Sequence, residues 1–312
     1  MSQSELSPEV LGVSKARAEW RARLRSLRLP ALRMGWALLP ASVFFLIFLI
    51  APLGVVVYYS LQPNPLVGDA EDGLSLVNYA YFLARSHYVR VIARTLRFAL
   101  LTTIGSVIIG YGAALVLRRV SERIGSTAVL VLAFPILSGP IVTVMGWMIM
   151  FTSGGVVGRS LALARGIIGL PEASTRLLGT DTAVIIGMIH FNLAFVILNL
   201  LNVMLKIEPT LEEAAMNLGA NRWQTFRHVI WPLSLPGVFS ASLISFALAM
   251  NAFVNPTYLG NASRLVMTTL ISQFMLTAYN WQMASATSVI LLWLSLVIII
   301  VYNRVFSRAI KI

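Results

Sequence analysis

The 312-residue sequence contains no cysteine, and only 12% of its residues are charged. Without cysteine the chain can form no disulfide, thiolate metal site or cysteine nucleophile. Its three histidines lie in separate segments, and none has a second histidine at helical spacing, so we expect no zinc or haem site. None of its three lysines follows a glycine, so the phosphate-binding loop of nucleotide hydrolases is also missing. We therefore predict that the chain is not an enzyme and holds no metal or cofactor of its own.

Apolar residues dominate what is present. The sequence is 58% hydrophobic with a mean hydropathy of +0.81, which is too apolar for a soluble domain to cover itself with polar side chains. A bilayer core about 30 Å thick needs roughly 20 residues of helix. The apolar runs of this length are residues 36–59, 98–117, 128–151, 183–205, 238–254 (extendable to 259) and 283–301. The sequence thus predicts an all-α integral membrane protein with six transmembrane helices.

The basic residues are unevenly distributed and give a formal net charge of +12. Sixteen of the 24 lysines and arginines lie in residues 1–35, after the second apolar run, at or beside a polar segment (residues 207–232), or in the C-terminal tail. The positive-inside rule places these regions, including both termini, in the cytoplasm. We predict no nucleic-acid binding, but a basic cytoplasmic segment (1–35) before a six-helix transmembrane domain (36–310). The basic segment either binds anionic membrane lipid or only sets the orientation.

The polar segment separates the fourth and fifth predicted spans and begins with the pattern of a short helix. Thr210 is a suitable N-cap and Glu213 follows three residues later, which predicts a capping box. Ala214 and Ala215 favour helix and present almost no side chain. Gly219 is suited to the left-handed residue that ends a helix. We therefore expect a short helix with small residues near its end.

A second short helix is expected at residues 221–230, with Trp223 and Phe226 on one face. Pro232 and Pro236 are expected to break this helix and to start the fifth span. Capping, or packing against the membrane surface, could each explain part of this pattern. Neither explains why all these features occur together between two spans. We interpret the polar segment as a helix–turn–helix exposed to the cytosol, where another protein could bind it.

The spacing within the polar segment resembles the EAA loop of ABC-importer permeases, which docks on the ATP-hydrolysing subunit. The family pattern is Glu-Ala-Ala, three residues, Gly, nine residues, Ile, one residue and Leu-Pro. The sequence has Glu213–Ala215, Gly219, Val229 and Trp231–Pro232 at these positions, with valine and tryptophan as apolar replacements. The resemblance implies a role in ATPase coupling for Glu212, Glu213, Ala214, Ala215, Gly219, Ala220, Arg222, Trp223 and Phe226.

The resemblance extends over about residues 36–310. Within the family, this part of the chain is similar to the spermidine/putrescine permease group. The segments that carry it are Phe134–Pro135 with Trp147, Gly154–Val157, Phe253–Pro256, Leu259–Gly260 and Asn280–Trp281. Iron(III), opine, sulfate and thiamine permeases share parts of these segments, so importers of such solutes stay open as alternatives. The family implies a type I (MetI-like) permease of the bacterial inner membrane that works by alternating access.

That resemblance also implies the partners. They are two copies of a cytoplasmic ATP-binding subunit, a second homologous permease, an external or periplasmic solute-binding protein, and membrane lipid. ATP and magnesium would be bound by the ATPase partner and not by this chain. A self-contained secondary transporter is the alternative from another class. It should show intramembrane carboxylates or inverted repeats, and the sequence shows neither.

Polar and aromatic side chains within the spans are candidates for a solute pathway. They are Trp147, His190, Asn192, Asn251, Asn255 and Tyr258. Hydrogen bonding between helices is an equally good explanation for the asparagines and the histidine. Asn251 and Asn255 form the strongest pair, because we expect them one turn apart on one helix face. No Asp or Glu lies inside a predicted span, and Asp181 lies at the edge of the fourth. A cationic solute would thus need a carboxylate from the second permease; otherwise the solute is zwitterionic or anionic.

Overall fold

The computed structural model describes residues 31–64, 73–168, 176–261 and 264–309, and within these ranges all regular secondary structure is helical. The chain forms two units, Met1–Val56 and Val57–Ile312. The described elements are α2 (Ala31–Leu61), α3 (Val77–Ala84), α4 (Ser86–Leu137), α5 (Pro140–Phe151), α6 (Val156–Ile168), α7 (Asp181–Met204), α8 (Pro209–Asn217), α9 (Arg222–Thr225), the π-helical turn η1 (Phe226–Ile230), α10 (Trp231–Met250), α11 (Val254–Leu259), α12 (Met267–Ser272), the π-helical turn η2 (Gln273–Thr277) and α13 (Trp281–Ala309).

In the part of the chain that the structure describes, six helical stretches are long and apolar enough to cross a membrane, which confirms the prediction of six spans. They are Ser42–Leu61, Ser86–Arg119, Pro140–Ile168, Asp181–Met204, Arg222–Met250 and Trp281–Phe306. The first unit contains most of α2, an apolar helix with Pro40 and Pro52 inside it. Transmembrane helices tolerate such prolines better than soluble helices do. The predicted division at residue 35 stays a prediction, because residues 1–30 lie outside the described residues.

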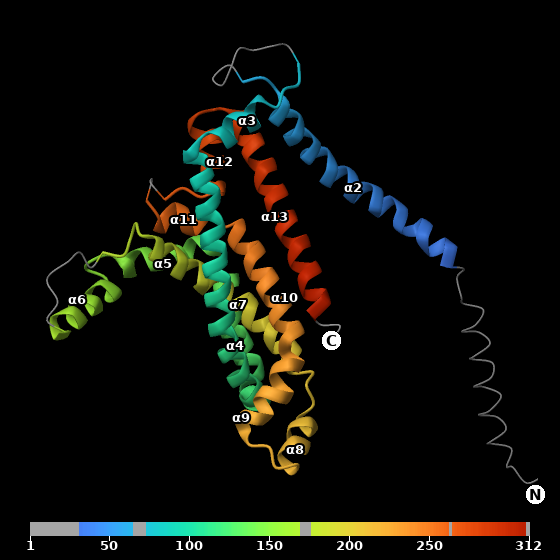
Figure 1. The fold of residues 1–312 in the computed structure, drawn as a ribbon, viewed down its shortest axis with the longest axis vertical. Coiled ribbons are helices and arrows are strands. Elements are labelled where there is room, and N and C mark those ends of the chain that lie inside the picture. The colour runs from blue at the N-terminus through green and yellow to red at the C-terminus, as the bar shows by residue number, and fades with distance from the viewer. Residues whose placement is uncertain (1–30, 65–72, 169–175, 262–263, 310–312) are drawn as a thin grey trace, which may run out of the picture. The chain divides into compact units, whose positions relative to one another are not determined.

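The centre of the second unit is a three-helix packing of α4, α7 and α10, with α8 and α9 at one end and α3 and α12 at the other (Figure 1). Glycines allow α4 to approach α7 closely. A Cβ added at Gly105 would lie 2.6 Å from Ile189 Cδ1, and one added at Gly110 would lie 2.6 Å from Val196 Cγ1. Small residues at such contacts are typical of helix packing in membranes, where close backbone approach replaces the hydrophobic driving force.

The third span differs from the prediction. Residues 128–151 were expected to form one helix, but α4 continues to Leu137 and a break follows at Ser138 and Gly139. Gly139 has φ +76°, which no helical residue adopts, and Pro140 occupies the first turn of α5. The predicted boundaries are therefore wrong. The break falls at the sequence Ser138-Gly139-Pro140 inside the apolar run, a turn signal that average hydropathy does not register. The second span also begins earlier than expected, at Ser86.

Candidate functional site

The first helix of the polar segment, α8, begins at Pro209. Its N-cap is Glu208, which makes no capping hydrogen bond with its side chain, while Thr210 Oγ1 donates to Glu208 Oε2 at 3.2 Å. The predicted capping box of Thr210 and Glu213 is therefore wrong. Pro209 explains the earlier start, because proline has the φ of a first helical residue and no N–H that would need a partner there.

The end of α8 agrees with the prediction for Gly219. This residue has φ +89°, in the left-handed region. Its N–H donates to the carbonyl of Met216 at 2.9 Å, and the N–H of Ala220 donates to the carbonyl of Ala215 at 3.1 Å. These are the two hydrogen bonds of a Schellman motif, which satisfies the last carbonyls of a helix and ends it. The turn between α8 and α9 is thus fixed by the backbone of one glycine.

The second helix of the polar segment continues into the fifth span without a break. It starts with a capping box in which Asn221 Oδ1 accepts from the Gln224 N–H at 2.9 Å and Gln224 Oε1 accepts from the Asn221 N–H at 2.8 Å. The turn η1 follows, and α10 begins directly after it. The prediction that Pro232 and Pro236 break the helix is therefore wrong. In a regular α-helix the ring of Pro232 would clash with the carbonyl four residues earlier, and the wider π turn before it relieves that conflict.

The tip of the polar segment is apolar and exposed. Leu218 is 89% exposed and Trp223 is 65% exposed. Trp223 stacks on Phe226, with 5.5 Å between the ring centroids. A groove of about 410 Å³ runs between α8 and the second helix, and its lining consists of Ala215, Leu218, Gly219, Ala220, Gln224, Thr225, His228 and Val229. Exposed apolar side chains gathered around a groove are typical of a surface that binds another protein.

The two glutamates of the polar segment have different surroundings. Glu213 is exposed, as are Ala214 and Arg222, and among the described residues no ion pair holds it. Glu212 Oε1 instead lies 2.5 Å from Nη1 of Arg118 in α4, and its side chain is 22% exposed. In the sequence, Arg118 stands out only as one of the basic residues that indicate orientation. No local pattern could have identified this pairing, because the end of α4 and the whole of α5, α6 and α7 separate the partners along the chain.

A cavity of about 460 Å³ lies beside the end of α10. It brings together three of the predicted pathway residues, Asn192, Asn251 and Asn255, with apolar residues of α5, α7, α10 and α11. Asn251 and Asn255 do not share a helix face as predicted, because α10 ends at Met250 and α11 starts at Val254. The break nevertheless leaves both asparagines on the wall of the same cavity.

The three asparagines are not equivalent. Asn192 is 2% exposed, and its Nδ2 donates to both the carbonyl and the Oγ of Ser245 at 3.0 Å. It therefore joins α7 to α10, which is the structural alternative considered for it. Asn255 is 6% exposed, and its Oδ1 would lie 2.8 Å from a Cβ added at Gly187. Asn251 is the exposed member, and its Nδ2 donates to the carbonyl of Ala247 at 2.9 Å.

The remaining predicted pathway residues lie outside the lining of this cavity. Trp147 and His190 contact each other edge to face, with ring centroids 5.4 Å apart, and Trp147 also stacks on Phe151 at 4.9 Å. Nδ1 of His190 is buried and has no hydrogen-bond partner among the described residues. Tyr258 is 40% exposed. The predicted set of six is thus divided between the cavity, a separate aromatic pair and one exposed tyrosine.

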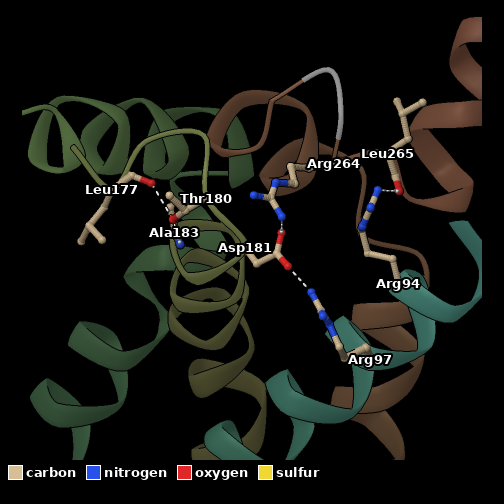
Figure 2. A network of polar contacts seen from close by, with 8 residues as sticks. All are labelled: Arg94, Arg97, Leu177, Thr180, Asp181, Ala183, Arg264 and Leu265. Atoms are coloured by element: carbon tan, nitrogen blue, oxygen red, sulfur yellow. Dashed lines mark hydrogen bonds and ion pairs between the residues drawn. The ribbon is translucent and has the colours of Figure 1, made fainter. Parts of the chain in front are cut away.

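An ion network lies at the opposite end of α7 from the polar segment (Figure 2). Asp181 Oδ1 accepts from Arg264 Nη1 at 2.7 Å, and its Oδ2 is bound by Arg97. Arg94 Nη1 donates to the carbonyl of Leu265 at 3.2 Å. The carboxylate that the sequence places nearest to a span therefore has both oxygens bound by arginines. Within the described residues, no group of three or more His, Cys, Asp or Glu side chains could hold a metal ion.

A sequence model of the binding-protein-dependent transport system inner membrane component matches residues 106–312, which include the whole polar segment. The chain belongs to this family. A similar member is the spermidine/putrescine transport system permease protein PotB of Haemophilus influenzae, 30% identical over 270 residues, or 82% of this chain and 93% of that protein. The PotB protein of Salmonella typhimurium is 28% identical over 274 residues, or 84% and 94% of the two chains.

The ferric transport system permease protein FbpB of Actinobacillus pleuropneumoniae is 29% identical over 220 residues, which is 70% of this chain and 31% of that protein. Among solved structures, a chain of the bacterial alginate ABC transporter superposes with a TM-score of 0.72 at 21% identity, covering 94% of this chain and 98% of that one. A chain of the MetNI methionine ABC transporter gives a TM-score of 0.53 at 22% identity, covering 71% and 95%. The fold is therefore that of ABC-transporter permeases, and the chain is a multi-pass membrane transport subunit.

Proposed function

We propose that this chain is one permease subunit of a bacterial inner-membrane importer driven by separate ATPase subunits, and that its polar segment is the surface on which an ATPase docks. The observation that carries the proposal is the exposed surface formed by α8 and the turn that follows it. Glu213 and Ala214 are exposed there, Gly219 fixes the turn, and an apolar groove lies behind them. Small residues let a partner approach the backbone, and the exposed carboxylate of Glu213 offers it a charge to bind.

The rest of the assembly follows from this docking role. Two copies of the ATPase would bind this chain and a second, homologous permease, and a solute-binding protein would deliver the solute from outside. ATP and magnesium would be held by the ATPase alone. The charge asymmetry of the sequence supports a cytoplasmic position for the polar segment and both termini. Closure of the two ATPases would pull the docked segments together and switch the permease pair between inward-open and outward-open states.

The solute proposed is a small polyamine, as in the PotB relatives, with iron(III), opine-like amino-acid derivatives and thiamine as alternatives. The cavity at the end of α10 offers amide groups and the aromatic residues Phe191 and Phe253. Amide oxygens and aromatic faces both suit an ammonium group. Of the described spans, only the one that starts at Asp181 contains a carboxylate, and two arginines neutralise it. The second permease would therefore supply the negative charge that a polycation needs.

A co-purification experiment tests the docking surface. The permease is extracted from its native membranes in mild detergent, as wild type, as Glu213→Lys and as Glu208→Lys. Glu208 is a matched control, because it is also an exposed glutamate but is the N-cap of α8, before the helix begins. We expect the ATPase to be lost from Glu213→Lys and retained by the other two proteins. Retention of the ATPase by Glu213→Lys would refute docking at this surface.

A further inference from the structure

Arg118 connects α4 to the beginning of the polar segment. Its Nη1 lies 2.5 Å from Glu212 Oε1, in the first turn of α8, and its Nη2 donates to the carbonyl of Ile207 at 2.8 Å, just before α8 begins. The Arg118 side chain is only 12% exposed. One planar guanidinium thus holds both the entry to α8 and its first turn. Arginine is suited to this task, because its donors form a rigid fork that can bind two acceptors at once.

A second contact joins α4 to the end of the polar segment. The hydroxyl of Tyr111 lies 2.8 Å from Ser234 Oγ in a buried hydrogen bond. The Tyr111 ring also meets the rings of Trp231 and Phe226 edge to face, at centroid distances of 5.3 and 6.3 Å. Tyr111 precedes Arg118 by seven residues, about two helical turns, so both lie on the same face of α4. One face of α4 therefore holds the polar segment at both of its ends.

The two ends differ in how they are held. The second helix of the polar segment is continuous with α10 through η1, so a displacement there is carried directly into the fifth span. No such continuity exists for α8, which packs mainly against α9 and η1 and is separated from them by the glycine turn. The Arg118 fork is what ties α8 to a transmembrane helix from the side.

We propose that Arg118 is the positioning residue that makes α8 and α4 move as one body, so that a displacement of α8 is transmitted to the transmembrane helices. The inference rests on the proposed docking of an ATPase on α8. It assigns separate roles to the two neighbouring glutamates: Glu213 faces the partner, and Glu212 holds the helix to its own bundle. Disruption of the fork should uncouple ATP hydrolysis from transport without preventing the ATPase from binding.

The test uses the full complex with its ATPase, second permease and solute-binding protein, reconstituted in liposomes. Basal ATP hydrolysis and the number of putrescine molecules transported per ATP are measured for the wild type, Arg118→Ala and Arg119→Ala. Arg119 is the matched control, because it is the adjacent arginine on the same helix but is exposed. For Arg118→Ala we expect bound ATPase and basal hydrolysis within about twofold of wild type. Transport per ATP should fall by roughly tenfold or more, because the variant loses both charge-assisted contacts and each corresponds to about one decade in an equilibrium constant. Arg119→Ala should behave as wild type.

Exchange of the two charges separates a positioning role from a general need for arginine. The double variant Arg118→Glu with Glu212→Arg restores the ion pair but not the hydrogen bond to the carbonyl of Ile207, so it should recover only part of the transport per ATP that Arg118→Ala loses. If Arg118→Ala does not assemble, Arg118→Lys carries the test, because lysine keeps the charge but not the fork; we expect intermediate coupling. Wild-type coupling in Arg118→Ala, or no recovery in the exchanged pair, would overturn the inference. A wild-type complex without any bound ATPase would instead refute the proposed function itself.

Discussion

The turn at Gly219 allows a quantitative prediction, because strain and steric clash can be separated there. Gly219 has φ +89°, and a Cβ added to it would meet nothing within 4 Å. Replacement by alanine therefore costs only the backbone energy of a left-handed residue that carries a Cβ, roughly 1–2 kcal/mol. Asparagine tolerates this conformation better than alanine does, so Gly219→Asn should cost less. The expected order of turn stability is glycine, asparagine, alanine.

If an ATPase binds only the intact turn, its affinity should fall with the population of that turn. A cost of about 1–2 kcal/mol corresponds to a roughly 5- to 30-fold increase in Kd. The Kd would be measured by biolayer interferometry with the permease pair in nanodiscs and the purified ATPase in solution. Gly112→Ala is the control, because this position of α4 is also open to an added Cβ but has no positive φ. Equal Kd values for the wild type, Gly219→Asn and Gly219→Ala would refute the reasoning that the left-handed turn shapes the docking surface.

Three further outcomes are expected from single substitutions. Asp181→Asn removes the negative charge that two arginines share in a partly exposed network, and should lower the stability of the fold by about 1 kcal/mol. The measurement is the thermal midpoint of the detergent-solubilised protein, and an unchanged midpoint at low salt would contradict this. Asn192→Leu leaves Ser245 without its buried donor and should destabilise the fold by about 1–2 kcal/mol in the same assay. Asn251→Leu changes an exposed cavity wall, and should reduce transport in liposomes while the thermal midpoint stays unchanged; the opposite pattern would exclude Asn251 from the pathway.

Local sequence signals predicted part of the polar segment correctly. Gly219 was identified because a glycine after a run of helix-forming residues is a strong end signal. The start was wrong because two start signals compete there, and Pro209 prevailed over Thr210. Pro232 was expected to break a helix, but a π turn accommodated it, and nothing in the sequence marks that turn. Predictions of this kind fail where the backbone has two acceptable local solutions and tertiary packing selects one.

Contacts between distant parts of the chain could not be predicted from one sequence. Six spans follow from hydropathy because each span needs only its own apolar residues. Arg118 and Glu212, or Asp181 and its two arginines, meet only because helices far apart in the chain pack together. The cavity at Asn251 likewise depends on a break in the fifth span, which hides inside an apolar run. The pathway roles of its residues stay predictions until transport is measured.

The most direct test of the account is the energy source of transport. Uptake of labelled putrescine and spermidine would be measured in liposomes that contain the permease pair, with and without its ATPase, internal ATP and external solute-binding protein. We predict uptake only when all three are present, and none when an ion gradient is imposed on the permeases alone. Uptake by the permeases alone, driven by a proton or sodium gradient, would contradict the account and identify a self-contained secondary transporter.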